Sequence, residues 1–425
     1  MDYGHGGNFV NTVVLGAGIA GLGYASKARG NVKVFEKNAV PGGLCGSFII
    51  DGFTFDYGIH QSFTAIPEAR KFFDKTDYRC YSPHAANLYY GNDIPNPVIY
   101  NLYKFPEEVR TRLITSFKNR AKDIVVNTYA DWLRTTYGDE IKSMFYDVYT
   151  RKYWTVTSDE MSVSWIGKRL TEPVLEKIVR GADKKSEEDN YYASEMRYPK
   201  QGGFTSFLTS LTESLDIVCG KEAVSIDPDT RLVTFTDGSK VSYDNLASSI
   251  PLPVMAEIVR GVPENVKLAA SRLKWTNLSI VSVALNKQYV SDYIWDYVYD
   301  EDIIVSRINK PGMHSSHNTP PGKSSFQFEI YRQGKEKANA TEDVDSVICA
   351  AERLGIAEKE EILFTDHHQI PYANIIYYNG MEEDRDIVRR YLESRGIKLI
   401  GRFGRWEYLW SDQSYMSGIR AAGEG

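Results

Sequence analysis

The feature of this sequence that most constrains its fold is a glycine pattern near the N-terminus. Residues 11–15 (NTVVL) are typical of a short buried strand, and they run into Gly16-Ala-Gly18-Ile-Ala-Gly21, which opens a helix of small residues. In this spacing the first glycine allows a tight turn, the second lets a pyrophosphate approach the backbone, and the third lets helix and strand pack closely. The helix N-terminus adds free N–H groups and a positive dipole for phosphate.

An acidic residue in the expected place supports the same interpretation. A second strand is predicted at 32–36, and its last residue, Glu36, lies twenty positions after Gly16. An acidic side chain at that point accepts hydrogen bonds from the ribose hydroxyls of a dinucleotide. Strand, glycine turn, helix and second strand together predict a Rossmann-like dinucleotide-binding domain.

Composition restricts the class of protein further. At 425 residues, with 42% hydrophobic and 25% charged residues, the chain is long enough for two or three globular domains. A net charge of −6 without a basic block argues against nucleic acid as a partner. Neither a membrane span nor a signal sequence is evident, so we expect a cytoplasmic chain. The four cysteines form no C-x-x-C pair, which fits a reducing compartment and predicts neither a metal site nor a disulfide. His314 and His317 lack carboxylate partners at metal-ligand spacing and are predicted to be solvent-exposed.

The segment after Glu36 indicates which dinucleotide is bound. Pro41-Gly42-Gly43-Leu44 follows Glu36-Lys37, and residues 222–250 alternate like a strand–turn–strand. Both segments resemble those of a large flavoprotein group that includes amine oxidases, phytoene desaturases and pyranose mutases. The resemblance implies FAD as the cofactor. Its contacts would then include Gly16, Gly18, Gly21, Glu36, Lys37, Gly43, Leu44 and the backbone of Val224.

Changes in periodicity predict the remaining layout. Residues 40–64 are predicted as glycine-rich loop, residues 106 to about 180 have apolar side chains at helical spacing, and 181–195 are charged like a mobile loop. Residues 276–287, 295–308 and 325–333 alternate like strands. We therefore expect an α/β fold with a discontinuous Rossmann-like FAD-binding domain, a helical insertion domain and an antiparallel β-sheet domain. The expected boundaries are 1–80, 200–262 and 396–425 for the first, 106–195 for the second, and 81–105 with 263–395 for the third.

The end of the chain carries the second informative motif. Gly401-Arg402-Phe403-Gly404-Arg405-Trp406-Glu407-Tyr408 resembles the G-R-x-G-x-[WY]-x-Y motif of UDP-galactopyranose mutases, which interconvert pyranose and furanose forms of a nucleotide sugar. Further segments resemble that family in the same order along nearly the whole chain. They are Gly58-Ile-His60, Tyr149 to Trp154, Trp165 to Arg169, Asp189-Asn190-Tyr191-Tyr192, Pro199 to Gly203, and Trp295 twelve residues before Arg307.

The resemblance implies a mechanism and a set of site residues. Reduced FAD, with NAD(P)H as its reductant, would attack the anomeric carbon through N5 and carry the sugar as an adduct while its ring reopens and recloses. Arginine suits a departing diphosphate because its planar fork donates two hydrogen bonds at once. The implied catalytic residues are His60, Arg169, Arg307, Tyr372 and Tyr408. Further FAD contacts would be Gly401, Arg402, Asp412, Gln413 and Met416. Substrate contacts would be Tyr100, Asn101, Thr150, Trp154, Arg180, Asn190, Tyr191 and Trp295, with Arg180 as the alternative to Arg169 for the loop-side phosphate.

Departures from the family pattern leave the substrate open. Thr150 stands where the eukaryotic-type enzymes have a uracil-binding asparagine, and residues 98–103 differ from the segment that feeds the base pocket. The partner is therefore expected to be a nucleoside-diphosphate sugar of undefined base and sugar, and the oligomeric state stays open. One alternative is an FAD-dependent oxidase or desaturase of the amine oxidase or protoporphyrinogen oxidase type; another is a flavoprotein without catalysis. Two convergent arginines over the flavin would favour the mutase, and an apolar box would favour the oxidase.

Overall fold

A five-stranded parallel sheet carries the glycine pattern. The computed structural model describes residues 10–167, 169–170, 172–186 and 195–423, and its strands β19-β13-β1-β2-β9 pair in that order, all parallel. Their bounds are Asn11–Leu15 (β1), Asn31–Phe35 (β2), Ile217–Val218 (β9), Asn245–Ser248 (β13) and Ile397–Leu399 (β19). Because the strands come from distant parts of the chain, this sheet is discontinuous in sequence, as expected.

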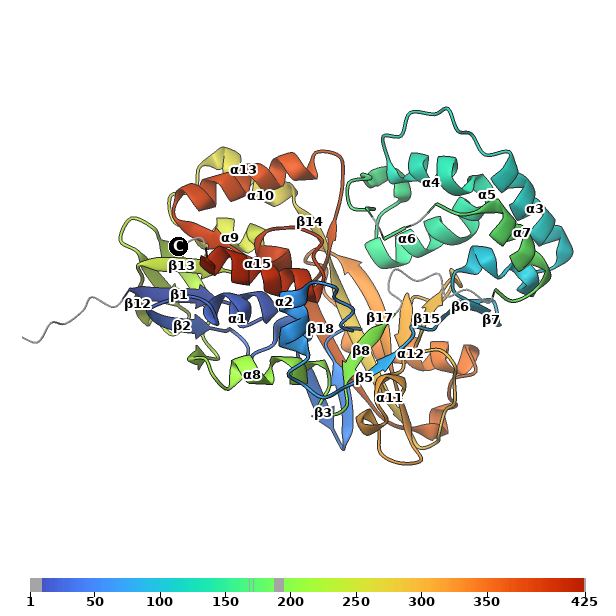
Figure 1. Ribbon diagram of the computed structural model, residues 1–425, viewed down its shortest axis with the longest axis horizontal. Coiled ribbons are helices and arrows are strands. Elements are labelled where there is room, and N and C mark those ends of the chain that lie inside the picture. The colour runs from blue at the N-terminus through green and yellow to red at the C-terminus, as the bar shows by residue number, and fades with distance from the viewer. Residues whose placement is uncertain (1–9, 168, 171, 187–194, 424–425) are drawn as a thin grey trace, which may run out of the picture.

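Two helices from opposite ends of the chain pack closely on this sheet. Helix α1 (Ile19–Ala25) follows the glycine turn, and α15 (Ser411–Gly423) lies beside it (Figure 1). A Cβ atom at Gly418 would lie 2.1 Å from the carbonyl oxygen of Ala20, and one at Gly23 would lie 2.9 Å from the ring of Tyr415. The contact therefore depends on the absence of side chains on both helices.

Short antiparallel pairs flank the parallel sheet. They are β3 (Ser47–Ile50) with β4 (Phe53–Asp56), β5 (Tyr78–Tyr81) with β8 (Met196–Pro199), and β10 (Ala223–Asp227), β11 (Leu232–Phe235) and β12 (Lys240–Ser242). The prediction of loop over 40–64 is wrong for the β3–β4 hairpin. Asp51 and Gly52 both have positive φ (48° and 82°), the geometry of a two-residue hairpin turn. Phe53 and Phe55 are fully buried beyond that turn.

The largest sheet of the described chain has seven strands and is separate from the parallel sheet. Its order is β18-β14-β17-β16-β15-β6-β7, with β15 and β6 parallel and every other pair antiparallel. The bounds are Ala85–Tyr89 (β6), Asn92–Pro95 (β7), Lys274–Leu285 (β14), Trp295–Val298 (β15), Arg307–Asn309 (β16), Ser324–Gln333 (β17) and Ile362–Ile376 (β18). The expected strand over 295–308 is two strands. Lys152 donates to the carbonyls of Val298 and Asp300 at 2.8 and 3.0 Å, which fixes the intervening loop.

The predicted helical insertion is present. It comprises α3 (Glu107–Lys118), α4 (Tyr129–Tyr137), α5 (Asp139–Ile141), a π-helical turn (Lys142–Tyr146), α6 (Asp147–Trp154) and α7 (Leu175–Asp183). Figure 1 shows these helices gathered at one end of the molecule, away from β1 and β2. Thr128 starts α4 with a capping box, in which its hydroxyl accepts from the Asp131 N–H. The predicted loop over 181–195 begins within α7, and residues 187–194 lie outside the described part.

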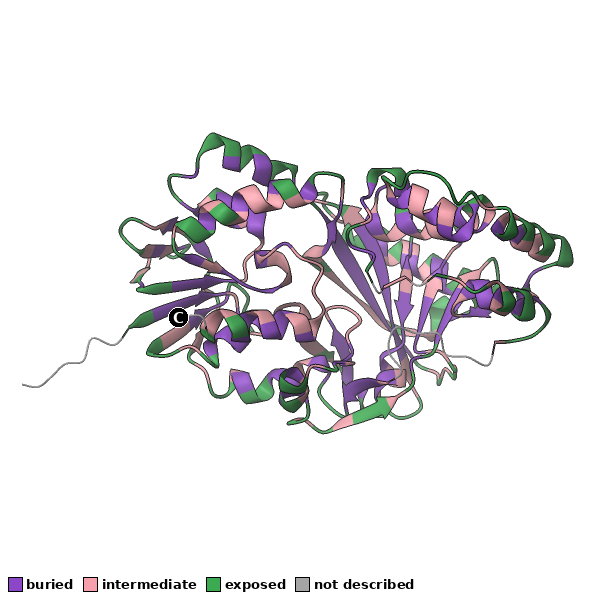
Figure 2. Cartoon of the chain, turned by 45° about the horizontal axis from the view of Figure 1, so that its top comes forward, coloured by how far each residue is buried: buried purple, intermediate pink, exposed green. Residues whose placement is uncertain are grey.

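The remaining α-helices pack against the sheets or against other helices. They are α2 (Pro67–Phe73), α8 (Thr209–Thr212), α9 (Leu252–Ile258), α10 (Glu264–Arg272), α11 (Pro311–His314), α12 (Ala340–Arg353), α13 (Met381–Ser394) and α14 (Gly401–Gly404). In Figure 2 the strands in the middle of the molecule are coloured as buried, and the helices around them carry exposed residues. Among the described residues, no helix combines the length and apolar character that a bilayer crossing requires.

One histidine prediction is wrong. His317 is exposed, but His314 is only 2% exposed at the end of α11. Its Nε2 lies 2.7 Å from the Asn309 amide oxygen, and its Nδ1 lies 2.9 Å from the Tyr81 hydroxyl. The helical turn that begins at Pro311 carries this ring inward, where two polar partners satisfy it.

The close contact of α1 and α15 generates a stability prediction. Gly418→Ala should lower the free energy of unfolding by about 1–3 kcal/mol, because the new methyl group overpacks the backbone of Ala20. Gly423→Ala, in the same helix with no atom within 4 Å of the new Cβ, is the matched control. Urea denaturation of both variants would contradict the packing account if the two were equally stable.

Candidate cofactor and substrate cavity

A cavity of about 790 Å³ lies between the two sheets. Residues just beyond the carboxyl ends of β1, β2, β13 and β19 form one wall, which is where open α/β sheets bind ligands. Strands β17 and β18 supply the other wall. The predicted site residues that line the cavity are Gly16, Gly18, Glu36, Lys37, Gly43, Leu44, His60, Trp295, Arg307, Tyr372, Gly401, Arg402 and Tyr408.

The glycines at one end have distinct tasks. A Cβ at Gly21 would lie 1.9 Å from the carbonyl oxygen of Gly16, and one at Gly16 would lie 2.3 Å from the Ser249 hydroxyl. Those two glycines therefore serve the packing of strand, turn and helix. No described atom lies within 4 Å of a Cβ at Gly18, which opens onto the cavity at the start of α1. The structure thus leaves space at the helix N-terminus, where a phosphate is stabilised.

Glu36 is held in position by the backbone. It is 5% exposed, and its two carboxylate oxygens accept from the N–H groups of Ala17 and Asn38 at 2.8 and 2.9 Å. Each oxygen keeps a lone pair for another donor, such as a ribose hydroxyl. The second glycine loop packs beside the first, because Gly42 donates its N–H to the carbonyl of Ala17 at 2.9 Å. This end of the cavity fits the adenosine diphosphate half of FAD.

His60 lies on the cavity wall as a neutral ring. Its Nδ1 is 3.2 Å from the carbonyl oxygen of Gly58, and a carbonyl only accepts, so Nδ1 carries the proton. Burial lowers the pKa of His60 to about 4, and the charges of Arg307 and Arg402 lower it further against the opposing Gly58 hydrogen bond. Its Nε2 therefore offers a lone pair as a hydrogen-bond acceptor.

Arg307 forms a charge-balanced pair inside the cavity. Its Nε and Nη2 donate to the two carboxylate oxygens of Glu329 at 2.8 and 2.9 Å. The Tyr331 hydroxyl also donates to Glu329, at 2.8 Å. This bidentate pairing leaves the Nη1 side of Arg307 for a ligand, with the positive charge already balanced by a carboxylate.

Two further arginines, Arg169 and Arg402, have no carboxylate in the residues that the structure describes to balance their charge. The guanidinium carbons of Arg169 and Arg402 lie 4.2 and 4.4 Å from the ring centre of Tyr408. We call Arg169, Tyr408 and Arg402 the arginine–tyrosine cluster.

The hydrogen-bond partners of this cluster are neutral. Arg169 donates to the carbonyl oxygens of Trp165 and Tyr408, and Arg402 donates to the Asn374 amide oxygen at 2.8 Å. No carboxylate among the described residues pairs with either arginine. Burial lowers the pKa of Arg169, and the charge of Arg402 adds to that effect. This end of the cavity therefore carries excess positive charge.

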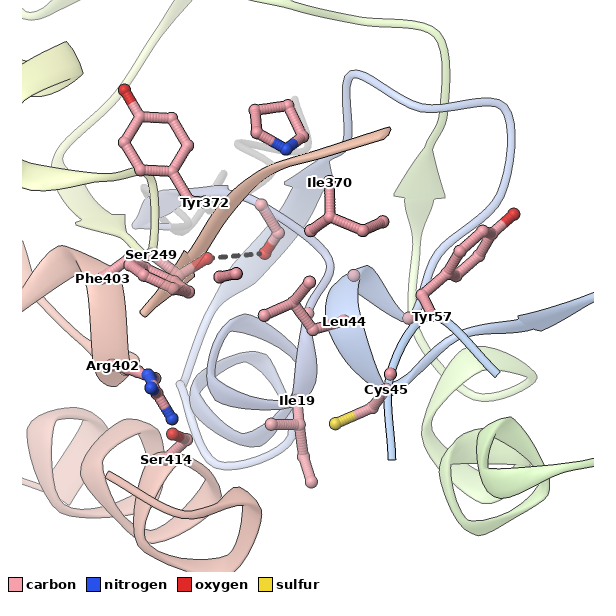
Figure 3. Close-up of a pocket in the computed structure, with 18 of the residues that line it drawn as sticks. Ile19, Leu44, Cys45, Tyr57, Ser249, Ile370, Tyr372, Arg402, Phe403 and Ser414 are labelled. Atoms are coloured by element: carbon pink, nitrogen blue, oxygen red, sulfur yellow. Dashed lines mark hydrogen bonds between the residues drawn. The ribbon is translucent and has the colours of Figure 1, made fainter. Parts of the chain in front are cut away.

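Aromatic side chains complete the wall near these charges. Tyr372 stacks on Trp275 with ring centres 4.8 Å apart, and burial raises the pKa of its hydroxyl to about 12. The hydroxyl is therefore a neutral donor at physiological pH. Figure 3 shows Tyr372 and Arg402 on one side of the cavity view, Tyr57 on the other and Leu44 between them.

Several predicted substrate contacts lie away from the cavity. The Tyr100 hydroxyl accepts from the N–H of Val174 at 3.0 Å. Asn101 donates to the carbonyls of Pro95 and Pro97, and its amide oxygen accepts from the Ser186 N–H at 3.0 Å. These two residues tie the segment before α3 to the segments around α7.

The other predicted substrate residues are scattered. Thr150 is buried within α6, and Trp154 packs its ring 5.6 Å from that of Tyr408. Arg180 is exposed on α7. Asn190 and Tyr191 lie outside the described residues. The structure therefore brings together the predicted cofactor and phosphate residues more completely than those expected to contact the base.

The remaining predicted FAD contacts, Asp412, Gln413, Met416 and Val224, do not line the cavity, although residues beside them do. Ser411 and Ser414 line the cavity at the start of α15, whereas Asp412 and Met416 are buried and Gln413 accepts from the Trp410 N–H at 3.0 Å. Val224 is 43% exposed, and the three residues before it line the cavity.

Sequence reasoning missed much of the opposite wall. Besides the predicted Tyr372, residues 368–371, 373 and 374 of β18 line the cavity, as do Glu329 and Tyr153. The sequence does contain a signal for Glu329. It lies between two apolar residues of a predicted strand, and a buried carboxylate requires a charged or hydrogen-bonding partner. The β18 segment contains Pro371 and two adjacent histidines, which disguise a fifteen-residue strand.

Comparisons with known proteins agree with this architecture. Residues 14–76 match the family of NAD(P)-binding Rossmann-like domains. A crystal structure of reduced UDP-galactopyranose mutase covers 98% of this chain and 95% of its own, with a TM-score of 0.91 at 23% identity. A protein from Exiguobacterium sp. 255-15, provisionally named a protoporphyrinogen oxidase, covers 98% of both chains with a TM-score of 0.75 at 15% identity. An oxidoreductase from Methanosarcina mazei covers 98% of this chain and 100% of its own, with a TM-score of 0.66 at 16% identity. At identities below 25% these structural likenesses show the fold alone, and the predicted fold class is confirmed.

The environment of His60 generates a pH prediction. Its Nε2 should stay unprotonated from pH 7.5 down to pH 5, because its pKa lies at about 4 and not at the ordinary 6.5. The unfolded chain binds this proton more readily, so His60 should reduce stability as the pH falls from about 6.5 towards about 4. Nitrogen-15 spectra of labelled histidine, assigned with His60→Asn, test this. Protonation near pH 6.5 or above would contradict it.

Proposed function

We propose that this chain is an FAD-dependent mutase that interconverts pyranose and furanose forms of a nucleoside-diphosphate sugar. The observation that carries the proposal is the arginine–tyrosine cluster. Its Arg402 and Tyr408 line the same cavity as the glycine turn, and Arg169 stacks on the Tyr408 ring without lining the cavity itself. One end of the cavity suits a dinucleotide, and the other has uncompensated positive charge. A diphosphate leaving group needs such charge close to the cofactor.

The residues at the glycine end fit FAD. Gly18 leaves room at the N-terminus of α1, and the fixed carboxylate of Glu36 can accept from a ribose. Lys37, Gly43 and Leu44 continue the wall toward His60. The chemistry that reduced FAD supplies is a nitrogen nucleophile for the anomeric carbon of the sugar. NADPH or NADH is the proposed source of the electrons.

The protein's own contribution is to bind and stabilise the departing diphosphate. Arg402 would contact its oxygens, and Arg169, whose guanidinium also lies against the Tyr408 ring, would add positive potential. The Nη1 side of Arg307 can donate as well, with its orientation fixed by Glu329. Loss of one preorganised donor of this kind typically costs about 3 kcal/mol in the transition state. Neutral hydroxyls such as that of Tyr372 would add about 0.5–1.5 kcal/mol each.

His60 would act as an acceptor. Its Nε2 lone pair can receive a hydrogen bond from a sugar hydroxyl and so orient the ring. Because burial keeps its pKa at about 4, the imidazole does not compete as a cation for the diphosphate. The role differs from that of a general acid, which needs a pKa close to the working pH.

An FAD-dependent oxidase or desaturase is the second candidate. The likeness to the Exiguobacterium protein, with a TM-score of 0.75, favours it. Apolar residues also line part of the cavity, including Ile59, Phe63 and Leu278. Against it stands the cost of two half-buried guanidinium groups, Arg169 and Arg402, without a carboxylate partner among the described residues, which an apolar substrate would leave uncompensated. A flavoprotein without catalysis would show a reducible flavin and no turnover.

Turnover of sugar nucleotides tests the proposal. FAD-loaded protein, air-oxidised or dithionite-reduced, would be incubated with a panel that includes UDP-galactofuranose, and products separated by anion exchange. Interconversion at unchanged mass, only with reduced flavin, is the expected result. A substrate oxidised with oxygen uptake, and no isomerised sugar, would favour the oxidase.

Arginine variants test the site within the same assay. Arg402→Met should lower kcat/KM by roughly 100-fold, because it removes a donor to the leaving group. Arg405→Met is the control, since Arg405 pairs with Glu407 and does not line the cavity. Equal losses in the two variants would count against the cluster as the diphosphate site.

A further inference from the structure

The turn that joins α14 to α15 depends on a hydrogen bond from outside it. The N–H of Glu407 donates to the carbonyl of Arg402 at 2.9 Å, and that of Leu409 donates to the Glu407 carbonyl at 2.8 Å. The N–H between them, that of Tyr408, donates instead to the Tyr377 hydroxyl at 2.7 Å. A backbone N–H that leaves water needs a partner. The backbone at Tyr408 is therefore held by a side chain from another element.

The conformation of this turn is unusual at the residue two positions before Tyr408. Trp406 has a φ of 54° and is 0% exposed. Its ring meets those of Trp275 and Tyr372 edge to face, with ring centres 6.2 and 6.5 Å apart. A bulky residue seldom adopts a left-handed backbone, and it does so where the surrounding structure fixes it. The turn is thus held on one side by the packing of Trp406 and on the other by the Tyr377 hydroxyl.

Tyr377 is itself rigidly placed. It follows directly after β18 and is 5% exposed. Its carbonyl accepts from the N–H of Ser162, in the helical insertion, at 2.7 Å. Burial raises the pKa of its hydroxyl, although the Tyr408 hydrogen bond and nearby arginine charges act in the opposite direction. The hydroxyl therefore stays protonated at neutral pH and accepts the Tyr408 N–H through a lone pair.

Tyr408 transmits this placement to the cavity in two ways. Its side chain lines the cavity. Its carbonyl oxygen accepts from Nη2 of Arg169, whose guanidinium carbon lies 4.2 Å from the Tyr408 ring centre. A shift of the Tyr408 backbone would therefore move the ring and the Arg169 guanidinium together.

We propose that Tyr377 is a positioning residue that holds the Tyr408 backbone from behind the cavity wall, and so places the Tyr408 side chain and Arg169 for a diphosphate. The inference rests on the proposed function and deepens it, because it names the group that fixes part of the diphosphate site. Tyr377 does not line the cavity, so it acts on the ligand through Tyr408. Arg307 remains a further donor to the same diphosphate.

Calorimetric titration of the FAD-loaded protein with UDP and with inorganic pyrophosphate tests the proposal. Tyr377→Phe removes one oxygen and should weaken the binding of both by roughly 10-fold, because the Tyr408 N–H loses its partner. Tyr378→Phe is the matched control. It removes the neighbouring hydroxyl, which donates to the Asp384 carboxylate at 2.7 Å, and neither residue lines the cavity. This control should lose stability and keep both affinities. The pyrophosphate titration shows whether the effect concerns the diphosphate and not the base.

A second measurement separates positioning from a general loss of structure. In protein labelled with ¹⁵N-tyrosine, the Tyr408 amide resonance can be assigned with Tyr408→Phe. Its proton should move upfield in Tyr377→Phe, because the hydrogen bond is lost, and stay in place in Tyr378→Phe. In the wild-type protein the same resonance should shift when UDP binds, which tests the coupling even if Tyr377→Phe does not fold. FAD content and thermal midpoint identify a variant that has not folded.

The outcomes distinguish this inference from the function on which it rests. Unchanged UDP and pyrophosphate affinity in folded Tyr377→Phe, or an equal loss in Tyr378→Phe, would overturn the role of Tyr377 while the mutase could still stand. A Tyr408 resonance that moves neither with UDP nor in Tyr377→Phe would overturn it too. A wild-type protein that binds neither UDP nor pyrophosphate would overturn both.

Discussion

The parallel register of β1, β2, β13 and β19 is the constraint on which the rest of the structure depends. Because these strands run in one direction, Leu15, Phe35, Ser248 and Leu399 end at the same edge of the sheet. The glycine turn, Glu36, Ser249 and Gly401 follow directly and meet around one cavity. The close glycine-mediated contact between α1 and α15 then holds the C-terminal segment beside this cavity. A dinucleotide loop and an arginine-rich motif, nearly four hundred residues apart, thus share a site.

Charge compensation divides that site into different regions. Glu36 accepts from backbone N–H groups and can accept from a further hydroxyl donor. Arg307 and Glu329 balance each other's charge, and the Nη1 side of Arg307 stays open. Within the described part of the chain, no carboxylate pairs with the arginine–tyrosine cluster, whose partners are the carbonyls of Trp165 and Tyr408 and the amide of Asn374. Like charges so close together in a low-dielectric site are costly without an anion. This energetic argument, more than any single motif, favours a diphosphate substrate over an apolar one.

Residue spacing in the sequence could predict contacts within one local unit, but not contacts between separate elements of the fold. Gly16, Gly18 and Glu36 act within one strand–helix–strand unit, and residues 401–408 within one turn, so their spacing was informative. The pairing of Arg307 with Glu329 and of Arg402 with Asn374 joins separate elements, which no local spacing encodes. Tyr100 and Asn101 resembled substrate contacts, yet the fold uses their polar atoms to hold the segments around α7. The Asp51-Gly52 pair is a local signal of a two-residue hairpin turn, so the hairpin over 47–56 was predictable from the sequence.

The most direct test of this account is a crystal structure of the reduced, FAD-loaded protein with UDP. The account predicts the adenosine half of FAD at Gly18 and Glu36. It also predicts diphosphate oxygens of UDP within hydrogen-bonding distance of the Arg402 guanidinium, beside Tyr408. A diphosphate bound outside the cavity, or held by Arg307 with Arg402 turned away, would contradict it.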